Sequence, residues 1–273
     1  MGNGGAKNGS KLNNNRLEFT IDLARSAGVF AKSHFAEIDA LKIESKGHQD
    51  LVSNADIDTE TIIRNAIEKQ FPDDGIVGEE HGRKFGTSGY DWVIDPIDGT
   101  ANFVRGIPQW CVIIACVKDG ETQIGVIFEP CSNELFHATK GGGAFCNGKI
   151  IKTTTGSSIS DGSIGVGFSG RVHGKNILTA IEQILSNGGV FFRNASGGLM
   201  LAYVASGRLL GYIEEHMNSW DCVAGLLMVE EASGVIFKPN PENVLEKGTL
   251  VIAAGVNVFD TINSIAISSF AVS

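Results

Sequence analysis

Apolar and polar positions alternate in two different ways along the chain. In the first part, apolar residues recur at roughly helical spacing over 17–35 and again over 57–71, which predicts two helices. Asn54 or Asp56 is the expected N-cap of the second helix, and Pro72 would end it because proline cannot continue a helix. The ordered chain should therefore begin with two helices.

Short runs of β-branched and aromatic residues then indicate strands. They are expected at 76–77, 90–94, 111–117, 123–128 and 135–138. Lys118-Asp119-Gly120 is typical of a tight hairpin turn between two of these strands. The glycines at 141–143 lack the Lys-Ser/Thr ending of a phosphate loop, so we interpret them as a plain turn. The polar stretch 42–50 is expected to be a loop.

Strand and helix patterns alternate more regularly in the second part. Strands are expected at 163–168, 190–192, 210–213, 235–237 and 250–253, and helices at 176–185, 198–205, 220–232 and 256–267. We therefore predict an α+β protein with an N-terminal half over 16–155 and a C-terminal half over 156–273. Since no linker separates the halves, they should pack tightly as one structural unit.

Composition adds a leader and excludes some classes of partner. Residues 1–15 are mostly Gly, Asn, Lys and Ser, which predicts a disordered leader. No apolar run approaches the ~18 residues that cross a bilayer, so no membrane contact is expected. A formal net charge of -9 argues against nucleic-acid binding. The five cysteines form no C-x-x-C pair, which predicts reduced thiols and a cytoplasmic location.

The chemistry is concentrated in the stretch 92–100. Its strand should end at Pro96, which has no N–H for the ladder, so Asp95 and Asp98 would lie at a strand end. Gly99 permits a tight backbone path, and the amides of a following helical turn could hold an anion. Carboxylates for a cation beside amides for an anion predict a site for a metal phosphate.

Acidic residues occupy four predicted element ends. They are Asp56, Glu79-Glu80, Asp95/Asp98 and Asp221. If the fold brings them together, their charges repel, and all-oxygen ligands favour a hard cation such as Mg²⁺ or Mn²⁺. The six histidines show no i, i+4 pairing that would indicate zinc. The alternative is that each acid is a solvated surface charge or a helix cap.

Three motifs carry a resemblance to a known family. They are Gly78-Glu79-Glu80, Asp95-Pro96-Ile97-Asp98-Gly99-Thr100 and Trp220-Asp221-Cys222-Val223-Ala224-Gly225. In order and spacing they resemble the signatures of the inositol monophosphatase family, bacterial type, and the resemblance covers nearly everything after Leu17. It implies a layered α-β-α-β-α sugar-phosphatase-like fold, a homodimer, and lithium-sensitive, Mg²⁺-dependent hydrolysis of myo-inositol monophosphate by in-line attack of a metal-activated water.

The resemblance also implies roles for individual residues. The metal ligands would be Glu79, Asp95, the Ile97 carbonyl, Asp98 and Asp221. They would hold two or three Mg²⁺ ions, with Mn²⁺ as a substitute and Ca²⁺ and Li⁺ as inhibitors. The catalytic residues would be Thr100, Asp56 and Glu79, with Thr100 and Asp56 polarising the water and Glu79 bridging the metals. The substrate-binding residues would be Gly99 and Thr100 on the phosphate, with Glu214 and Asp221.

The alcohol that carries the phosphate is left open by the sequence. Arg208 and His216 could contact the substrate near Glu214, or be surface or interface side chains. Histidinol phosphate and other sugar or nucleotide phosphates are alternative small-molecule substrates. An aspartyl-phosphate intermediate is disfavoured because two residues separate Asp95 from Asp98, where that chemistry needs one. Bacterial relatives resembling this family are linked to the transcription machinery, so a non-catalytic regulatory role is a further alternative.

Overall fold

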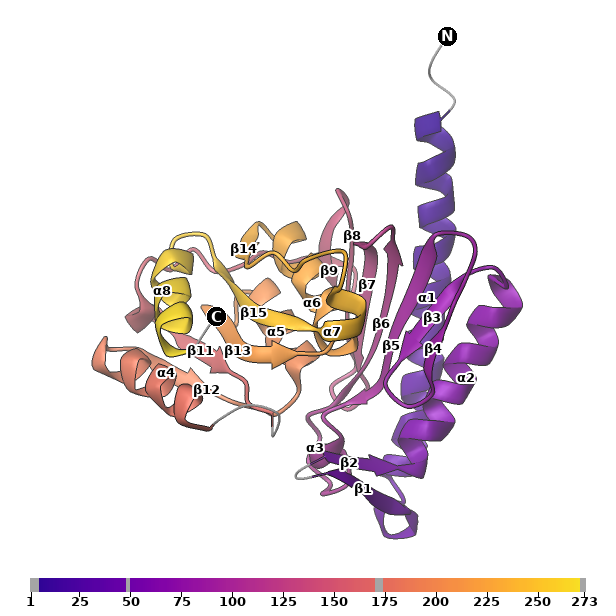
Figure 1. Ribbon diagram of the computed structural model, residues 1–273, viewed down its shortest axis with the longest axis horizontal. Coiled ribbons are helices and arrows are strands. Elements are labelled where there is room, and N and C mark those ends of the chain that lie inside the picture. Colours follow the sequence, from indigo (N-terminus) through magenta and orange to yellow (C-terminus); the bar gives the residue numbers. More distant parts are fainter. Residues whose placement is uncertain (1–4, 48–49, 170–173, 271–273) are drawn as a thin grey trace.

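Helices and sheets alternate in five layers (Figure 1). The computed structural model describes residues 5–47, 50–169 and 174–270. In order across the molecule, the layers are helices α1 (Gly5–Phe35) and α2 (Asn54–Gln70), an eight-stranded sheet, helices α5 (Gly197–Ala205) and α6 (Ser219–Glu231), a five-stranded sheet, and helices α4 (Gly174–Ser186) and α8 (Phe259–Ser269). The predicted α+β fold with α-β-α-β-α layers is therefore confirmed.

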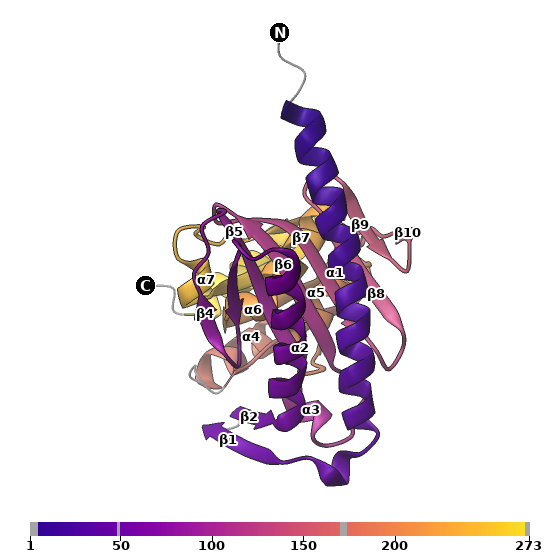
Figure 2. The same ribbon diagram turned by 90° about the vertical axis from the view of Figure 1, so that its right-hand side faces the viewer.

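The eight-stranded sheet comes from the first part of the chain. Its spatial order is β10 (Lys149–Ile150), β9 (Gly143–Cys146), β8 (Glu134–Thr139), β7 (Glu121–Glu129), β6 (Cys111–Lys118), β5 (Tyr90–Asp98), β3 (Gly75–Gly78) and β4 (Gly82–Lys84). One face is covered by α1 and α2 (Figure 2). There Leu23 of α1 and Ile63 of α2 belong to the same buried apolar cluster as Trp92 and Ile94 of β5, which fixes both helices on the sheet.

The five-stranded sheet comes from the second part of the chain. Its spatial order is β12 (Val190–Phe192), β11 (Ser163–Val166), β13 (Gly211–Met217), β15 (Thr249–Gly255) and β14 (Gly234–Ile236). Between the two sheets, α5 and α6 contribute Leu201 and Leu227 to one apolar cluster that also contains Ile113 of the first sheet and Val251 of the second. The two sheets therefore share a core.

The start of α1 and the segment that follows this helix differ from the sequence predictions. Helix α1 begins at Gly5, whereas the sequence predicted a disordered leader over 1–15, and 1–4 lie outside the described residues. Extending an existing helix forms one hydrogen bond per added residue without a new nucleus, so a polar segment can continue it. The stretch 42–50 is not simply a loop, since β1 (Ile43–Gly47) pairs antiparallel with β2 (Asp50–Ser53).

The start of α2 and the remaining short elements complete the chain. Ser53 is the N-cap of α2, whereas the sequence favoured Asn54 or Asp56. Asp56 instead occupies the third helical position and closes a capping box with Ser53. The short helices are η1 (Ile38–Ala40), α3 (Thr100–Phe103), η2 (Ile159–Asp161) and α7 (Val244–Lys247). Along the described parts of the chain, no helix has both the length and the apolar character needed to span a bilayer. All five cysteines are free thiols.

Candidate active site

A bulge in β5 brings two carboxylates to the same face of the sheet. Asp95 pairs with Ile113 of β6 and Asp98 pairs with Cys111, so three steps along β5 match two steps along β6. Without the extra residue, side chains three apart would point to opposite faces. The sequence prediction that the strand stops at Pro96 is therefore wrong, because the irregular register lets β5 continue past the missing N–H.

The first turn of α6 adds a third carboxylate. Asp221 lies at the third helical position, and its Oδ2 accepts a hydrogen bond from the Asn218 amide at 3.2 Å. One carboxylate oxygen each from Asp95, Asp98 and Asp221 lie within 4.8 Å of one another. The structure thus brings together three carboxylates that the sequence predicted to be metal ligands.

The N-terminus of α5 orients Asp98. Its Oδ2 accepts hydrogen bonds from the Ser196 hydroxyl at 2.6 Å and the Gly198 amide at 2.7 Å, and its Oδ1 accepts from the Gly197 amide at 3.2 Å. Burial raises the pKa of Asp98, although these donors oppose the shift. The carboxylate is therefore held in one orientation by donors at the start of α5, which lies in the middle layer between the two sheets.

Crowding of negative charge is strongest at Asp95. The side chain is buried, and its Oδ1 accepts a hydrogen bond from the Ile97 amide at 2.9 Å. Burial raises the pKa of Asp95 well above its usual value, and the charges of Glu79, Asp98, Asp221 and Asp56 raise it further, in that order. The simple interpretation of Asp95 as a solvated surface acid is therefore excluded. An all-oxygen, anionic pocket of this kind fits a hard divalent cation.

A hydroxyl–carboxylate pair lies next to the acidic cluster. The Thr100 hydroxyl is 3.1 Å from Asp56 Oδ1 and 3.0 Å from the Ile97 carbonyl, so it can donate to either oxygen. Asp56 Oδ2 accepts from the amide and the hydroxyl of Ser53 at 2.9 and 2.6 Å. Burial raises the pKa of Asp56, while Ser53 and Thr100 oppose that change. The helix cap of α2 is thus also the support of Thr100.

Gly99 has the backbone conformation that the sequence led us to expect. Its φ of 99° lies in the left-handed region, and it is the N-cap of α3. A Cβ there would lie 3.0 Å from the Gln109 carbonyl oxygen. Both the conformation and the space therefore favour glycine at this position.

Glu79 and Glu214 lie around the three aspartates without belonging to the compact set. Glu79 follows β3 directly, and among the carboxylates it has the largest effect on Asp95. Glu214 is a buried residue of β13 whose Oε2 accepts a hydrogen bond from the Tyr212 hydroxyl. Glu214, Asp98 and Asp221 all raise the pKa of Tyr212, after burial. The residues predicted from the sequence therefore converge on one region.

Two side chains considered for substrate contact are engaged elsewhere. The Arg208 guanidinium binds both carboxylate oxygens of Glu134 and lies over the Tyr203 ring, 5.1 Å from its centroid. His216 Nε2 lies 2.8 Å from the Lys247 carbonyl oxygen. These contacts favour the structural interpretation of both residues.

Three supporting residues were missed by the sequence analysis. They are Ser53, Glu60 and Ser196, which contact Asp56, the turn after Glu79, and Asp98. Glu60 had a detectable signal, because it lies one helical turn after Asp56 on a predicted helix. Ser196 had none, since its partner is 98 positions away in sequence.

Comparisons with known proteins identify the family of the chain. The model of the inositol monophosphatase family matches residues 12–266. "Nus factor SuhB" of Xylella fastidiosa is 35% identical over 263 residues, 93% of this chain and 94% of that protein. "Inositol-1-monophosphatase" of Rhizobium meliloti is 37% identical over 221 residues, 80% of this chain and 83% of that protein. The structure of an IMPase from Thermotoga maritima superposes with a TM-score of 0.83 at 30% identity, covering 93% of this chain and 98% of that one. The chain therefore belongs to the inositol monophosphatase family.

Proposed function

We propose that the protein hydrolyses a small phosphate monoester, with myo-inositol monophosphate as its substrate, and that it does so in the cytoplasm as a homodimer. The observation that carries this proposal is the compact set of Asp95, Asp98 and Asp221 beside the Thr100–Asp56 pair. Relatives named inositol-1-monophosphatase, 36% and 37% identical to this chain, support the choice of substrate.

The proposed cofactor is Mg²⁺, as two or three ions, with Mn²⁺ as a substitute and Ca²⁺ and Li⁺ as inhibitors. The residues that would hold it are Glu79, Asp95, the Ile97 carbonyl, Asp98 and Asp221. The anionic character of this donor set supports the fit, since its three other carboxylates all raise the pKa of Asp95. When bound, Mg²⁺ would neutralise phosphate charge and lower the pKa of a water molecule.

The chain's own groups would orient the water and the substrate. When the Thr100 hydroxyl donates to Asp56, its oxygen is left to accept a hydrogen bond from the attacking water. The backbone amides of Gly99 and Thr100 would hold phosphate oxygens. Glu214 would accept hydrogen bonds from the alcohol hydroxyls, and Asp221 would contact both metal and substrate. Differential contacts at Glu214 would then select the alcohol.

A panel of phosphate monoesters at fixed Mg²⁺ tests the proposal. The panel contains inositol 1-phosphate, histidinol phosphate, glycerol phosphate, a hexose phosphate and a nucleotide monophosphate. We expect the highest kcat/KM for inositol 1-phosphate, no turnover in EDTA, and inhibition by Li⁺. Preference for another ester would change the substrate but keep the reaction. The absence of turnover with every ester would refute the phosphatase proposal.

A regulatory binding role is the second candidate. The observation that favours it is the name "Nus factor SuhB" of relatives at 35–37% identity over 81–93% of this chain. The two roles separate in an Asp95→Asn variant, because hydrolysis needs the carboxylate and a docking surface on the folded chain does not. If cells that carry the Asp95→Asn variant grow like cells that carry the wild type, while cells without the protein do not, the regulatory role would be favoured.

A further inference from the structure

Helix α2 carries two fully buried carboxylates one turn apart. Asp56 and Glu60 are each 0% exposed, and at i, i+4 spacing they lie on the same face of the helix. Asp56 contacts Thr100, as described above. Glu60 contacts the turn between β3 and β4, which contains Glu79. The His81 side chain adds further contacts with α2, since its Nε2 lies 3.1 Å from the Thr61 hydroxyl and 3.3 Å from the Ile57 carbonyl oxygen.

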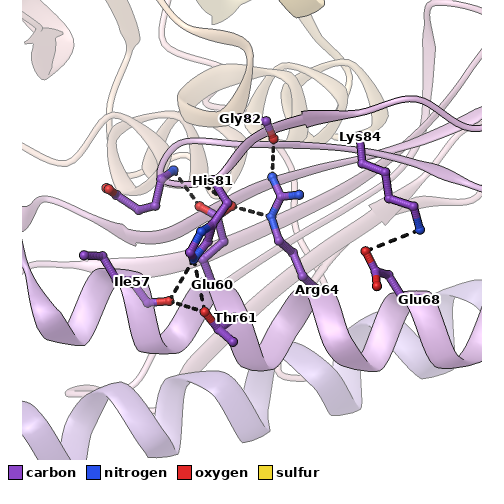
Figure 3. Close-up of polar contacts among 9 residues, drawn as sticks. Ile57, Glu60, Thr61, Arg64, Glu68, His81, Gly82 and Lys84 are labelled. Atoms are coloured by element: carbon purple, nitrogen blue, oxygen red, sulfur yellow. Dashed lines mark hydrogen bonds and ion pairs between the residues drawn. The ribbon is translucent and has the colours of Figure 1, made fainter.

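Glu60 accepts hydrogen bonds from consecutive backbone amides of that turn (Figure 3). Its Oε2 lies 2.7 Å from the Glu80 amide nitrogen, and its Oε1 lies 3.2 Å from the His81 amide nitrogen. Arg64, one turn further along α2, donates from Nε to Glu60 Oε1 at 2.6 Å and from Nη2 to the Gly82 carbonyl. Three successive positions after Glu79 are therefore fixed to one helix face.

The side chains of Glu60 and Arg64 fill the space that a side chain at position 78 would need. A Cβ at Gly78 would lie 2.1 Å from Glu60 Oε1 and 2.8 Å from Arg64 Nη2. The first residue of the Gly78-Glu79-Glu80 motif is thus explained by the approach of a buried carboxylate to the backbone.

The other side of the turn is fixed to the strand that carries Asp95. Gly78 pairs with Ile94 in the parallel β3–β5 ladder, and the Glu79 amide donates to the Ile94 carbonyl at 3.3 Å. Glu79 is therefore held between β5, through its own amide, and α2, through the amides that follow it. A buried ion pair is weak evidence for stability, since apolar residues of similar volume often serve as well. The hydrogen bonds of Glu60 with two backbone amides instead favour a positioning role.

We propose that Glu60, together with Arg64, is a positioning residue that sets the distance of Glu79 from Asp95 and so determines the affinity of the site for divalent cations. This inference rests on the proposed function, in which Glu79 is a metal ligand. Glu60 touches neither substrate nor metal in this scheme. It acts through the backbone of the turn 79–82.

The test compares Glu60→Gln with Glu68→Gln on the same helix. Glutamine keeps the size of Glu60, but its NH₂ group would face backbone and guanidinium N–H donors. Glu68 lies two turns further along α2 and pairs with Lys84 of β4 at 3.3 Å, with 44% of its side chain exposed (Figure 3). It is therefore a matched control that also links α2 to the same hairpin.

Mg²⁺ binding to the metal-free protein is measured by calorimetry, and amide hydrogen exchange is followed at 78–82. Loss of a residue that supports a ligand typically weakens metal binding about 10-fold to 100-fold, which is the effect expected for Glu60→Gln. Exchange at the Glu80 and His81 amides should also accelerate. Glu68→Gln should bind Mg²⁺ within about twofold of the wild type, since exposed ion pairs contribute little.

A structural role alone would give a different result. Glu60→Gln would then lower the free energy of unfolding in EDTA while the folded fraction bound Mg²⁺ with wild-type affinity, and that result would overturn the proposal. If Glu60→Gln does not fold, Arg64→Met replaces it, with an expected loss of Mg²⁺ affinity smaller than 100-fold, and wild-type affinity would again refute the idea. Failure of the wild type to bind any divalent cation would overturn it too. Turnover by the wild type is decided separately by the ester panel.

Discussion

Replacing Asp95 by asparagine separates two effects of the acidic cluster, which are charge repulsion in the metal-free protein and binding of Mg²⁺. Asparagine has nearly the same shape and keeps an oxygen that can accept the hydrogen bond from the Ile97 amide. It removes the charge that Glu79, Asp98, Asp221 and Asp56 oppose. We therefore expect a metal-free protein that is more stable than the wild type and has lost both Mg²⁺ binding and turnover.

The size of the gain follows from the spacing of the carboxylates. Asp95, Asp98 and Asp221 offer oxygens within 4.8 Å of one another. Two full charges at that distance repel by about 3 kcal/mol at an effective dielectric constant of 20. The raised pKa of Asp95 has the same cause, together with its burial. We therefore expect Asp95→Asn to raise the free energy of unfolding in EDTA by about 1–3 kcal/mol at pH 8.

The pH dependence gives the sign of the effect. The folded pKa of Asp95 is raised above the unfolded value of about 3.9, so between the two pKa values the folded state binds more protons than the unfolded state. The contribution of Asp95 to stability is therefore complete below about pH 3.9 and falls as pH rises through the folded pKa. The advantage of Asp95→Asn should shrink as the pH is lowered from 8 toward 4.

Urea unfolding followed by circular dichroism, in EDTA and in Mg²⁺, measures both quantities. Asp58→Asn, an exposed position on α2, is the matched control for loss of one charge. A variant less stable than the wild type at pH 8 in EDTA would refute the repulsion argument and make Asp95 a structural residue. A stability gain that does not vary with pH would refute the assignment to its ionisation.

Three further predictions address single contacts. Thr100→Ala should lower kcat by about 10²-fold to 10⁴-fold, whereas Thr100→Ser should restore most of it, because only the hydroxyl bonded to Asp56 is required. Equal kinetics in the two variants would refute this. Glu214→Gln should raise KM about 10-fold to 100-fold, with the Mg²⁺ affinity measured by calorimetry unchanged. An equal loss of substrate affinity and Mg²⁺ affinity would remove Glu214 from the substrate pocket. Gly78→Ala should lower the free energy of unfolding by about 1–3 kcal/mol, because its Cβ would meet Glu60 Oε1 at 2.1 Å. Gly174→Ala should leave the free energy of unfolding unchanged in the same urea assay, because a Cβ at Gly174 meets no atom closer than 3.9 Å.

Long periodic segments were predictable from the sequence and irregular backbone was not. The helix over 57–71 and the hairpin turn at Lys118-Asp119-Gly120 are confirmed, because each depends on residues close in sequence. The pairing of β1 with β2 was missed, since its backbone hydrogen bonds do not require an apolar pattern. Pro96 does lack a ladder donor, as expected, but the bulge absorbs the defect and β5 continues to Asp98.

In the candidate site, the carboxylates were predictable from the sequence and the residues that orient them were not. Residue types at element ends, together with the family resemblance, were enough to select Asp95, Asp98 and Asp221, which the structure places together. The groups that orient them could not be selected, because Ser196 and Glu60 act through contacts formed only after distant elements pack. The types of the site residues could thus be recognised from short motifs, whereas their geometry depends on contacts between distant segments.

The attachment of Asp98 to Ser196 and Gly198 has a consequence for synthesis of the chain. These donors lie 98 and 100 positions after Asp98, and Asp221 follows later still. Contacts between segments so far apart require closure of a long loop and form slowly compared with local structure. While a ribosome is still making the second half, the emerging chain therefore carries Asp95 and Asp98 without the partners that complete the site. The complete set of three carboxylates therefore forms only after the segment that carries Asp221 has been made.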